Sequence, residues 1–67
     1  MPEFTRARAR ALCRRRLMTM KRSIIAMAGH WDDLDMGIVR DLEDLALDID
    51  LLLEAMDESV EEEALNR

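Results

Sequence analysis

The residues best suited to chemistry are the arginines near the start of the chain. Six of the eleven residues at positions 6–16 are arginine, and no acid interrupts them. Guanidinium groups form paired hydrogen bonds to phosphates and carboxylates, so this segment could contact a nucleic acid or an acidic helix of the same protein. The candidate contact residues are Arg6, Arg8, Arg10, Arg14, Arg15 and Arg16.

Two other interpretations of this basic segment concern targeting and processing. Residues 4–31 are rich in arginine, amphipathic and free of acids, as mitochondrial presequences are. Met18 or Met20 could also be the true start, which would make residues 1–17 a leader. A regular helical pattern runs through the segment, and this pattern favours a helix of the folded protein instead.

The remaining candidates for catalysis or metal binding are few. Cys13 is the single cysteine, and its place in an apolar row predicts a small buried side chain and not a nucleophile. His30 could bind a metal with Asp32, Asp33 and Asp35, but helix capping explains these acids better. No nucleophile, base and pocket occur together, so we predict no catalytic residue, no cofactor and no metal ligand, and a protein that is not an enzyme.

Size and composition favour one small helical domain that needs additional stabilisation. The chain has 67 residues, of which 49% are hydrophobic and 37% charged, with two glycines, one proline and no tyrosine. A domain this small buries about 60% of the surface of its unfolded chain, and without a disulfide or a metal the usual remedy is a second subunit or a partner. No stretch approaches the roughly 18–20 apolar residues of a membrane span, so a soluble, cytoplasmic protein is expected.

Charge is strongly segregated along the chain. Residues 1–22 contain eight basic residues and one acid, whereas residues 23–67 contain two basic residues and fourteen acids, and the net charge is −5. Such asymmetry is typical of a charged interaction tail, unless the two halves fold onto each other. The apolar pattern decides between these interpretations.

Apolar residues predict a first helix at about residues 5–28. They recur at alternating steps of four and three residues, which is the repeat of a helix with one apolar seam. Thr5 is a suitable N-cap, and Gly29 suits the left-handed residue that follows many helices. The predicted seam consists of Cys13, Leu17, Met20, Ile24, Met27 and Trp31.

A second helix is predicted at about residues 33–60, with Asp32 as its N-cap. Two apolar rows run side by side along it, so its apolar surface is wider than one partner helix can cover. A single continuous helix through both glycines is the structural alternative, and residues 1–4 and 61–67 are expected to fray. The first row consists of Ile38, Leu42, Leu45, Ile49, Leu52 and Met56, and the second of Val39, Ala46, Leu53 and Val60.

The predicted fold is an all-α antiparallel hairpin that dimerises into a four-helix bundle or docks on a partner. A turn at residues 29–32 would place Arg10 level with Leu51, close to the acids of the second helix. Exposed ion pairs contribute only about 0–1 kcal/mol each. These pairs would therefore select orientation and partner, while the apolar seams stabilise the fold.

These observations predict a small helical protein-interaction module that acts as a regulator, inhibitor or assembly subunit of bacterial or phage type. It would dock through its wide apolar stripe and acidic surface on a protein partner or a second copy, and its acids could imitate the charge of nucleic acid. The alternatives are a nucleic-acid-binding protein that uses the arginine segment and, after it, a small enzyme with a site between subunits. The predicted self-association or partner residues are Leu17, Met20, Ile24, Met27, Trp31, Ile38, Leu42, Leu45, Ile49, Leu52, Leu53 and Met56.

Overall fold

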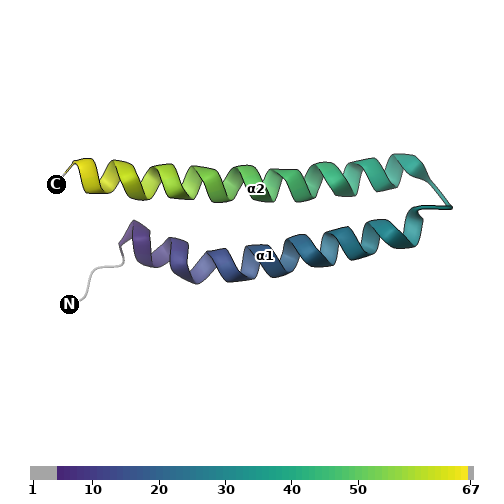
Figure 1. Ribbon diagram of the computed structural model, residues 1–67, viewed down its shortest axis with the longest axis horizontal. Helices are drawn as coiled ribbons and strands as arrows, with labels where there is room; N and C mark the ends of the chain where they lie inside the picture. Colours follow the sequence, from purple (N-terminus) through teal and green to yellow (C-terminus); the bar gives the residue numbers. More distant parts are fainter. Residues whose placement is uncertain (1–4, 67) are drawn as a thin grey trace.

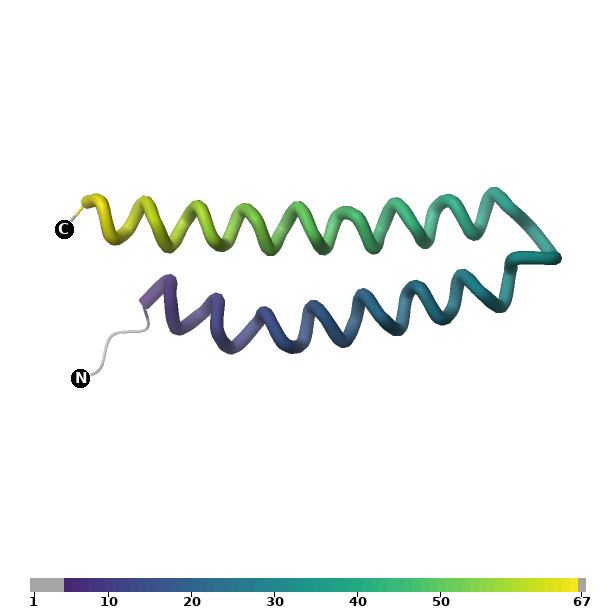
Figure 2. The backbone as a smooth tube through the Cα atoms, in the orientation of Figure 1, coloured from purple at the N-terminus to yellow at the C-terminus, as the bar shows by residue number. Residues whose placement is uncertain are grey.

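The protein is an antiparallel hairpin of two helices, in a computed structural model that describes residues 5–66 (Figure 1). Helix α1 spans Arg6–Trp31 and helix α2 spans Met36–Leu65, and a turn at residues 32–35 joins them. The helices lie side by side in one layer with extents of 52 × 20 × 11 Å (Figure 2). The predicted all-α hairpin is confirmed, and the single continuous helix is excluded.

Helix α1 begins where the sequence predicts. Thr5 is the N-cap, with an extended backbone (φ −73°, ψ 161°), and its side-chain oxygen accepts a hydrogen bond from the N–H of Arg8 at 3.2 Å. This bond satisfies one of the amide groups that a helix start leaves without a partner. The arginine segment is therefore part of a capped helix of the hairpin.

Helix α1 runs past its predicted end at residue 28 as far as Trp31. Gly29 is part of the helix, and neither described glycine has a positive φ. The turn closes instead on Trp31, whose carbonyl oxygen accepts the N–H groups of Leu34 and Asp35 at 2.9 and 3.0 Å. The prediction that Gly29 ends the helix is therefore wrong.

Helix α2 begins with a cap other than the predicted one. Asp35 has an extended backbone (φ −156°, ψ 106°), and its Oδ1 accepts the N–H of Gly37 at 2.9 Å. Asp32 has a helical backbone (φ −54°, ψ −39°) and stands just after α1. The later turn leaves Ala28 and Val39 buried, only 7% and 6% exposed, at this end of the hairpin. Burial of these apolar side chains outweighs the local preference for a turn at glycine.

Helix α2 also extends beyond its predicted end at residue 60, as far as Leu65. The N–H of Asn66 donates to the carbonyl oxygen of Glu62 at 3.1 Å and closes the last turn. The extension keeps Glu63 beside α1, where its Oε2 lies 3.4 Å from Nε of Arg6. Residues 1–4 and 67 lie outside the described part of the chain, so the prediction that they fray stays a prediction.

Replacing Gly29 by alanine is expected to stabilise the hairpin by about 0.5–1 kcal/mol, because glycine is the poorer helix former and the backbone here is already helical. A Cβ at Gly29 would have no atom within 4 Å, so nothing has to move. Urea denaturation followed by circular dichroism measures the free energy of unfolding.

Gly37→Ala is the matched control for this substitution. A Cβ at Gly37 would lie 3.1 Å from Oδ1 of Asp35, the oxygen that caps α2, so this variant should gain less stability or lose some. A less stable Gly29→Ala protein would contradict a helical backbone at residue 29. It would instead support the turn that the sequence predicts at Gly29.

The hairpin core is a thin line of side chains between the two helices. Ile24, Ala46 and Ile49 form its buried centre. No side chain among residues 5–66 is less than 2% exposed, so even this centre lies close to solvent. The partly buried residues packed against it are Leu17, Leu42 and Leu53.

The two apolar rows of α2 face different directions. Val39 and Ala46 of the second row are buried, whereas Leu45 and Leu52 of the first row are 48% and 46% exposed. Neighbouring residues on a helix point about 100° apart, so Leu45 and Ala46 cannot both face α1, although Ile49 of the first row is buried in the core. The hairpin covers the row at strict intervals of seven and leaves part of the other uncovered.

The register of the two helices differs from the predicted one. Arg10 lies level with Asp57, with 3.0 Å between Nη1 and Oδ1, and not with Leu51. Lys21 reaches Asp50 of α2, with 2.8 Å between Nζ and Oδ1. The correction follows from the later turn, because each residue by which the turn moves shifts the facing position by two.

Candidate functional site

The most distinctive surface of the hairpin is a line of large apolar side chains that the core does not cover. We call these residues the apolar stripe, and all of them are predicted self-association or partner residues. Such side chains are ordinary on a surface when scattered singly, but a continuous line of them indicates a contact surface. The apolar stripe consists of Met20, Met27, Trp31, Leu45 and Leu52, which are 53%, 46%, 41%, 48% and 46% exposed.

The α1 and α2 residues of the apolar stripe lie on the same side of the hairpin. Cys13 stands seven residues before Met20, and Ser59 stands seven residues after Leu52. Seven residues make about two helical turns, so each of these pairs points in one direction. Cys13 and Ser59 line one hollow of about 170 Å³ between the helices. The two halves of the apolar stripe therefore flank one side.

The other predicted residues of the set lie in the core or at its edge. Ile24 and Ile49 are buried, so they stabilise the hairpin itself. The sequence predicts a buried Cys13, but Cys13 is exposed. Of the predicted seam, Leu17 and Ile24 face α2, and Cys13 lies to one side of them. The half-buried members are Leu17, Ile38, Leu42, Leu53 and Met56.

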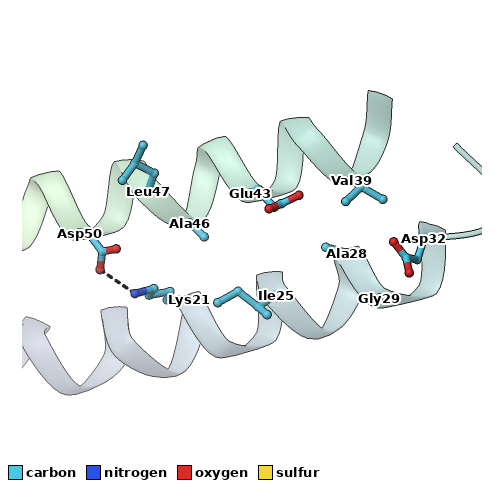
Figure 3. A pocket seen from close by; sticks show the side chains of 10 residues that line it. All are labelled: Lys21, Ile25, Ala28, Gly29, Asp32, Val39, Glu43, Ala46, Leu47 and Asp50. Carbon is cyan, nitrogen blue, oxygen red and sulfur yellow. Dashed lines mark hydrogen bonds and ion pairs between the residues drawn. The ribbon is translucent and has the colours of Figure 1, made fainter. Parts of the chain in front are cut away.

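The opposite side of the hairpin carries a polar crossing. Met20 and Lys21 come three and four residues after Leu17, so they lie on either side of the core row. Lys21 reaches across to Asp50 at 2.8 Å, as Figure 3 shows. The apolar stripe and this ion pair thus occupy opposite sides of the hairpin.

A shallow groove of about 480 Å³ lies beside this ion pair (Figure 3). Its most exposed apolar residues are Ile25 and Leu47, at 52% and 56%. The sequence did not predict the groove because these two residues stand outside the heptad rows. The available signal was that each directly follows an apolar residue of a row, Ile24 or Ala46. The other residues that line it are Lys21, Ala28, Gly29, Asp32, Val39, Glu43, Ala46 and Asp50.

Three of the predicted contact arginines pair with the acidic helix. Arg10 and Arg14 both approach Asp57 of α2, at 3.0 and 4.0 Å, and Arg6 approaches Glu63 at 3.4 Å. These side chains are more than a third exposed or nearly so, and pairs of this kind contribute about 0–1 kcal/mol each. They fix the register more than they stabilise the fold.

A basic ridge runs along the outside of α1. Arg8, Arg15 and Arg22 recur at intervals of seven, and all three are exposed. Arg22 stands two residues, or about 200°, from the core residue Ile24. The ridge therefore points away from α2, and Arg16 lies beside it in a hollow that it lines with Arg15 and Met20.

The turn end of the hairpin shows no metal centre in the described residues. His30, Asp32 and Asp33 are exposed, and no group of three His, Cys, Asp or Glu side chains within residues 5–66 is arranged to hold a metal ion. Over the same residues, neither helix is long and apolar enough to cross a membrane.

Comparison with known proteins gives no relative from which to transfer a role. The chain matches no protein-family model. No curated protein and no solved structure is significantly similar to it. The structure itself defines the class: a small, elongated helical hairpin with many exposed apolar residues, which is a surface suited to binding.

Proposed function

We propose that this protein is a small helical protein-interaction module, which acts as a regulator, inhibitor or assembly subunit by packing its apolar stripe against another helical surface. The observation that carries the proposal is the stripe itself, five large apolar side chains that are 41% to 53% exposed on one side of the hairpin. Continuous apolar surface of this kind on a soluble protein marks an interaction site.

The small size of the hairpin core supports the proposal. The described side chains that are buried are Ile24, Ala28, Val39, Ala46 and Ile49. The accessible surface is 5660 Å², whereas a compact monomer of 7.8 kDa would expose about 4,400 Å². A chain of this length needs further burial to be stable, and contact with another helical surface supplies it.

The side chains of the apolar stripe also suit a contact between proteins. Met20 and Met27 have flexible, polarisable side chains that adapt to irregular surfaces. Trp31 adds a large aromatic side chain at the turn end, and aromatic residues are enriched at the centres of interfaces. The stripe therefore combines an adaptable region with a bulky anchor.

The same proposal makes the protein a binder and not an enzyme. Cys13 and Ser59 line one hollow, but neither side chain forms a hydrogen bond with a histidine or a carboxylate within residues 5–66. A nucleophile normally has such a base within hydrogen-bond distance. Binding through the apolar stripe needs no such pair.

Mass and tryptophan shielding test the proposal together. Light scattering coupled to size-exclusion chromatography is expected to give at least about twice 7.8 kDa at low and high salt, with Trp31, the single tryptophan, shielded from acrylamide. A poorly helical chain that aggregates alone also fits, because it lacks the surface that covers the stripe. A monodisperse, fully helical monomer with a freely quenched Trp31 would overturn the proposal.

A second candidate function is nucleic-acid binding through the basic ridge. The observation that favours it is the heptad spacing of Arg8, Arg15 and Arg22 on the exposed outside of α1, which would place positive charges about 10 Å apart along one line. Binding of duplex DNA or RNA at low salt that weakens steeply as salt rises would support this candidate. No binding at low salt would remove it.

A further inference from the structure

We propose that the occupant of the apolar stripe is a second copy of this chain, packed with both turns at the same end, so that α1 of each copy lies beside α2 of the other. The inference rests on the proposed function and names the partner of the same surface. Three properties of the described residues carry it: the direction of the stripe, the area of the face that contains it and the charges along its edges.

The direction of the apolar stripe is that of a half-finished four-helix bundle. In such a bundle each helix has two neighbours at roughly right angles, so its apolar surface is wider than in a two-helix contact. On α1, two residues flank the core row that contains Ile24: Ala28 is buried on one side of the row, and Met27 is exposed on the other. On α2 the same division separates buried Ala46 from exposed Leu45. Within the hairpin, each helix therefore has one flank of its core row buried, and the other flank is free to contact a second layer of helices.

The face that carries the stripe has the area of a stable dimer interface. Helix α1 has 26 residues, which corresponds to a length of about 39 Å. The two helices together are 20 Å wide. The whole face therefore measures about 800 Å², which is the usual area per partner in a specific interface. The apolar stripe covers the half of it nearer the turn, about 18 Å along residues 20–31 of α1.

The charges of the two helices choose between the two symmetric ways of stacking one hairpin face on another. Helix α1 has eight basic residues and no acid, and helix α2 has eleven acids and one basic residue. With the turns at opposite ends, α1 would lie against α1 and α2 against α2, so like charges would meet along both contacts. With the turns at the same end, each contact joins a basic helix to an acidic one.

The residues at the outer edge of the stripe agree with the same-end arrangement. Ser23 and His30 stand at this edge of α1, and Asp41 and Asp48 stand at this edge of α2; all four are exposed. A twofold axis along the hairpin preserves the register of α1 with α2, which the ion pairs Arg10–Asp57 and Lys21–Asp50 define to within about one helical turn. It therefore places Ser23 within about one turn of Asp48 of the second copy.

The same symmetry places His30 within about one turn of Asp41 of the second copy, so no acid faces an acid along this edge. In the opposite-end arrangement the row of Asp41 and Asp48 would face the same row of the second copy. Like charges that face each other are unfavourable and serve to exclude wrong pairings. The edge charges thus favour the arrangement that the whole helices favour.

Distances between spin labels at the turn test the proposal. Leu34→Cys in a Cys13→Ser background gives one label site per copy, and both positions are exposed, Leu34 at 74%, so neither change touches the core. In the same-end dimer, with neighbouring axes about 8–10 Å apart, the labels should be within about 30 Å of each other. In the opposite-end dimer they would be separated by nearly the 52 Å length of the hairpin, which would overturn the proposed arrangement.

A second label site at the other end makes the result independent of the turn. Leu65, 86% exposed, replaced by cysteine in the same background should also give a short distance, and a long distance at either site would overturn the arrangement. A mass of 7.8 kDa without dipolar coupling would exclude the second copy as occupant.

Helix content then separates the failure of this inference from that of the proposed function. A poorly helical monomer would leave the stripe to another protein, so only the inference would fail. A fully helical monomer with a freely quenched Trp31 would overturn both.

Discussion

Replacing both Leu45 and Leu52 by glutamate is expected to dissolve the assembly and to lower its helix content in the same step. Burying the exposed half of each leucine is worth about 1 kcal/mol, and each copy contributes both residues. A carboxylate held in an apolar contact adds several kcal/mol of desolvation. The dissociation constant should therefore rise by at least about a thousandfold. Light scattering measures the mass, and circular dichroism the helix content.

The matched control places the same charges on the other side of α2. Leu47 and Leu51 are 56% and 53% exposed, similar to the stripe leucines, and Leu47 lines the groove that faces away from the stripe. Leu47→Glu with Leu51→Glu should keep the mass and the helix content of the wild type. Equal loss in both double variants would mean that added charge on α2, and not its position, unfolds the protein. An intact assembly with glutamate at Leu45 and Leu52 would exclude the stripe as the contact surface.

Loss of mass and loss of helix content are expected together because the hairpin has little core of its own. Its buried centre consists of Ile24, Ala46 and Ile49. Two helices with so small a centre gain little beyond the conformational entropy that folding removes. The surface that covers the stripe is thus part of what keeps the helices formed.

The helices themselves could be predicted from the sequence because their signal is local and repeated. Apolar residues at steps of three and four identify a helix whatever it packs against. Thr5 is a suitable cap by residue type, and the structure confirms it. Opposite charges in the two halves left open a charged tail or two halves that fold onto each other, and the apolar pattern favoured the second, with which the ion pair of Arg10 with Asp57 agrees.

The position of the turn could not be predicted, because residues 28–37 offer two adequate turns. Gly29 followed by Asp32 is one, and a helical Gly29 with Asp35 as the cap is the other, and the residue types suit both. The choice depends on the burial of Ala28 and Val39. This burial comes from contact between the two helices and not from the residue types of the turn itself. Tertiary packing therefore sets the position of the turn. The later turn changes which acids of α2 lie beside Arg6, Arg10 and Arg14.

The row of α2 that meets α1 was hidden for a related reason. Adjacent apolar rows, such as those of Leu45 and Ala46, carry the same periodicity, and periodicity alone does not say which of them faces the nearer helix. The structure assigns Ala46 to the hairpin and leaves Leu45 exposed. The excess width of the apolar surface was the sequence signal for a further contact, and the apolar stripe is where that width lies.

Replacing Ile49 by alanine is expected to destabilise the hairpin by about 2–5 kcal/mol, the range for removing a buried aliphatic side chain. Ile49 is 6% exposed and belongs to the cluster with Ile24 and Ala46. No thick core surrounds it to collapse into the space, and the neighbouring row is partly exposed. So large a loss approaches the whole stability of a small domain, and the urea midpoint should fall well below that of the Leu47→Ala protein.

The position and not the residue type should decide this loss, and Leu47→Ala is the control. Leu47 lies two residues away on the same helix and is 56% exposed, so its truncation should change the free energy of unfolding by no more than about 0.5 kcal/mol. Ile49→Val should fall between the two, at about 0.5–1.5 kcal/mol, because it removes one methyl group. Equal losses for Ile49→Ala and Leu47→Ala would contradict the proposed packing of α1 against α2. If that packing stabilises the hairpin, removing the buried side chain must cost more free energy of unfolding than removing the exposed one.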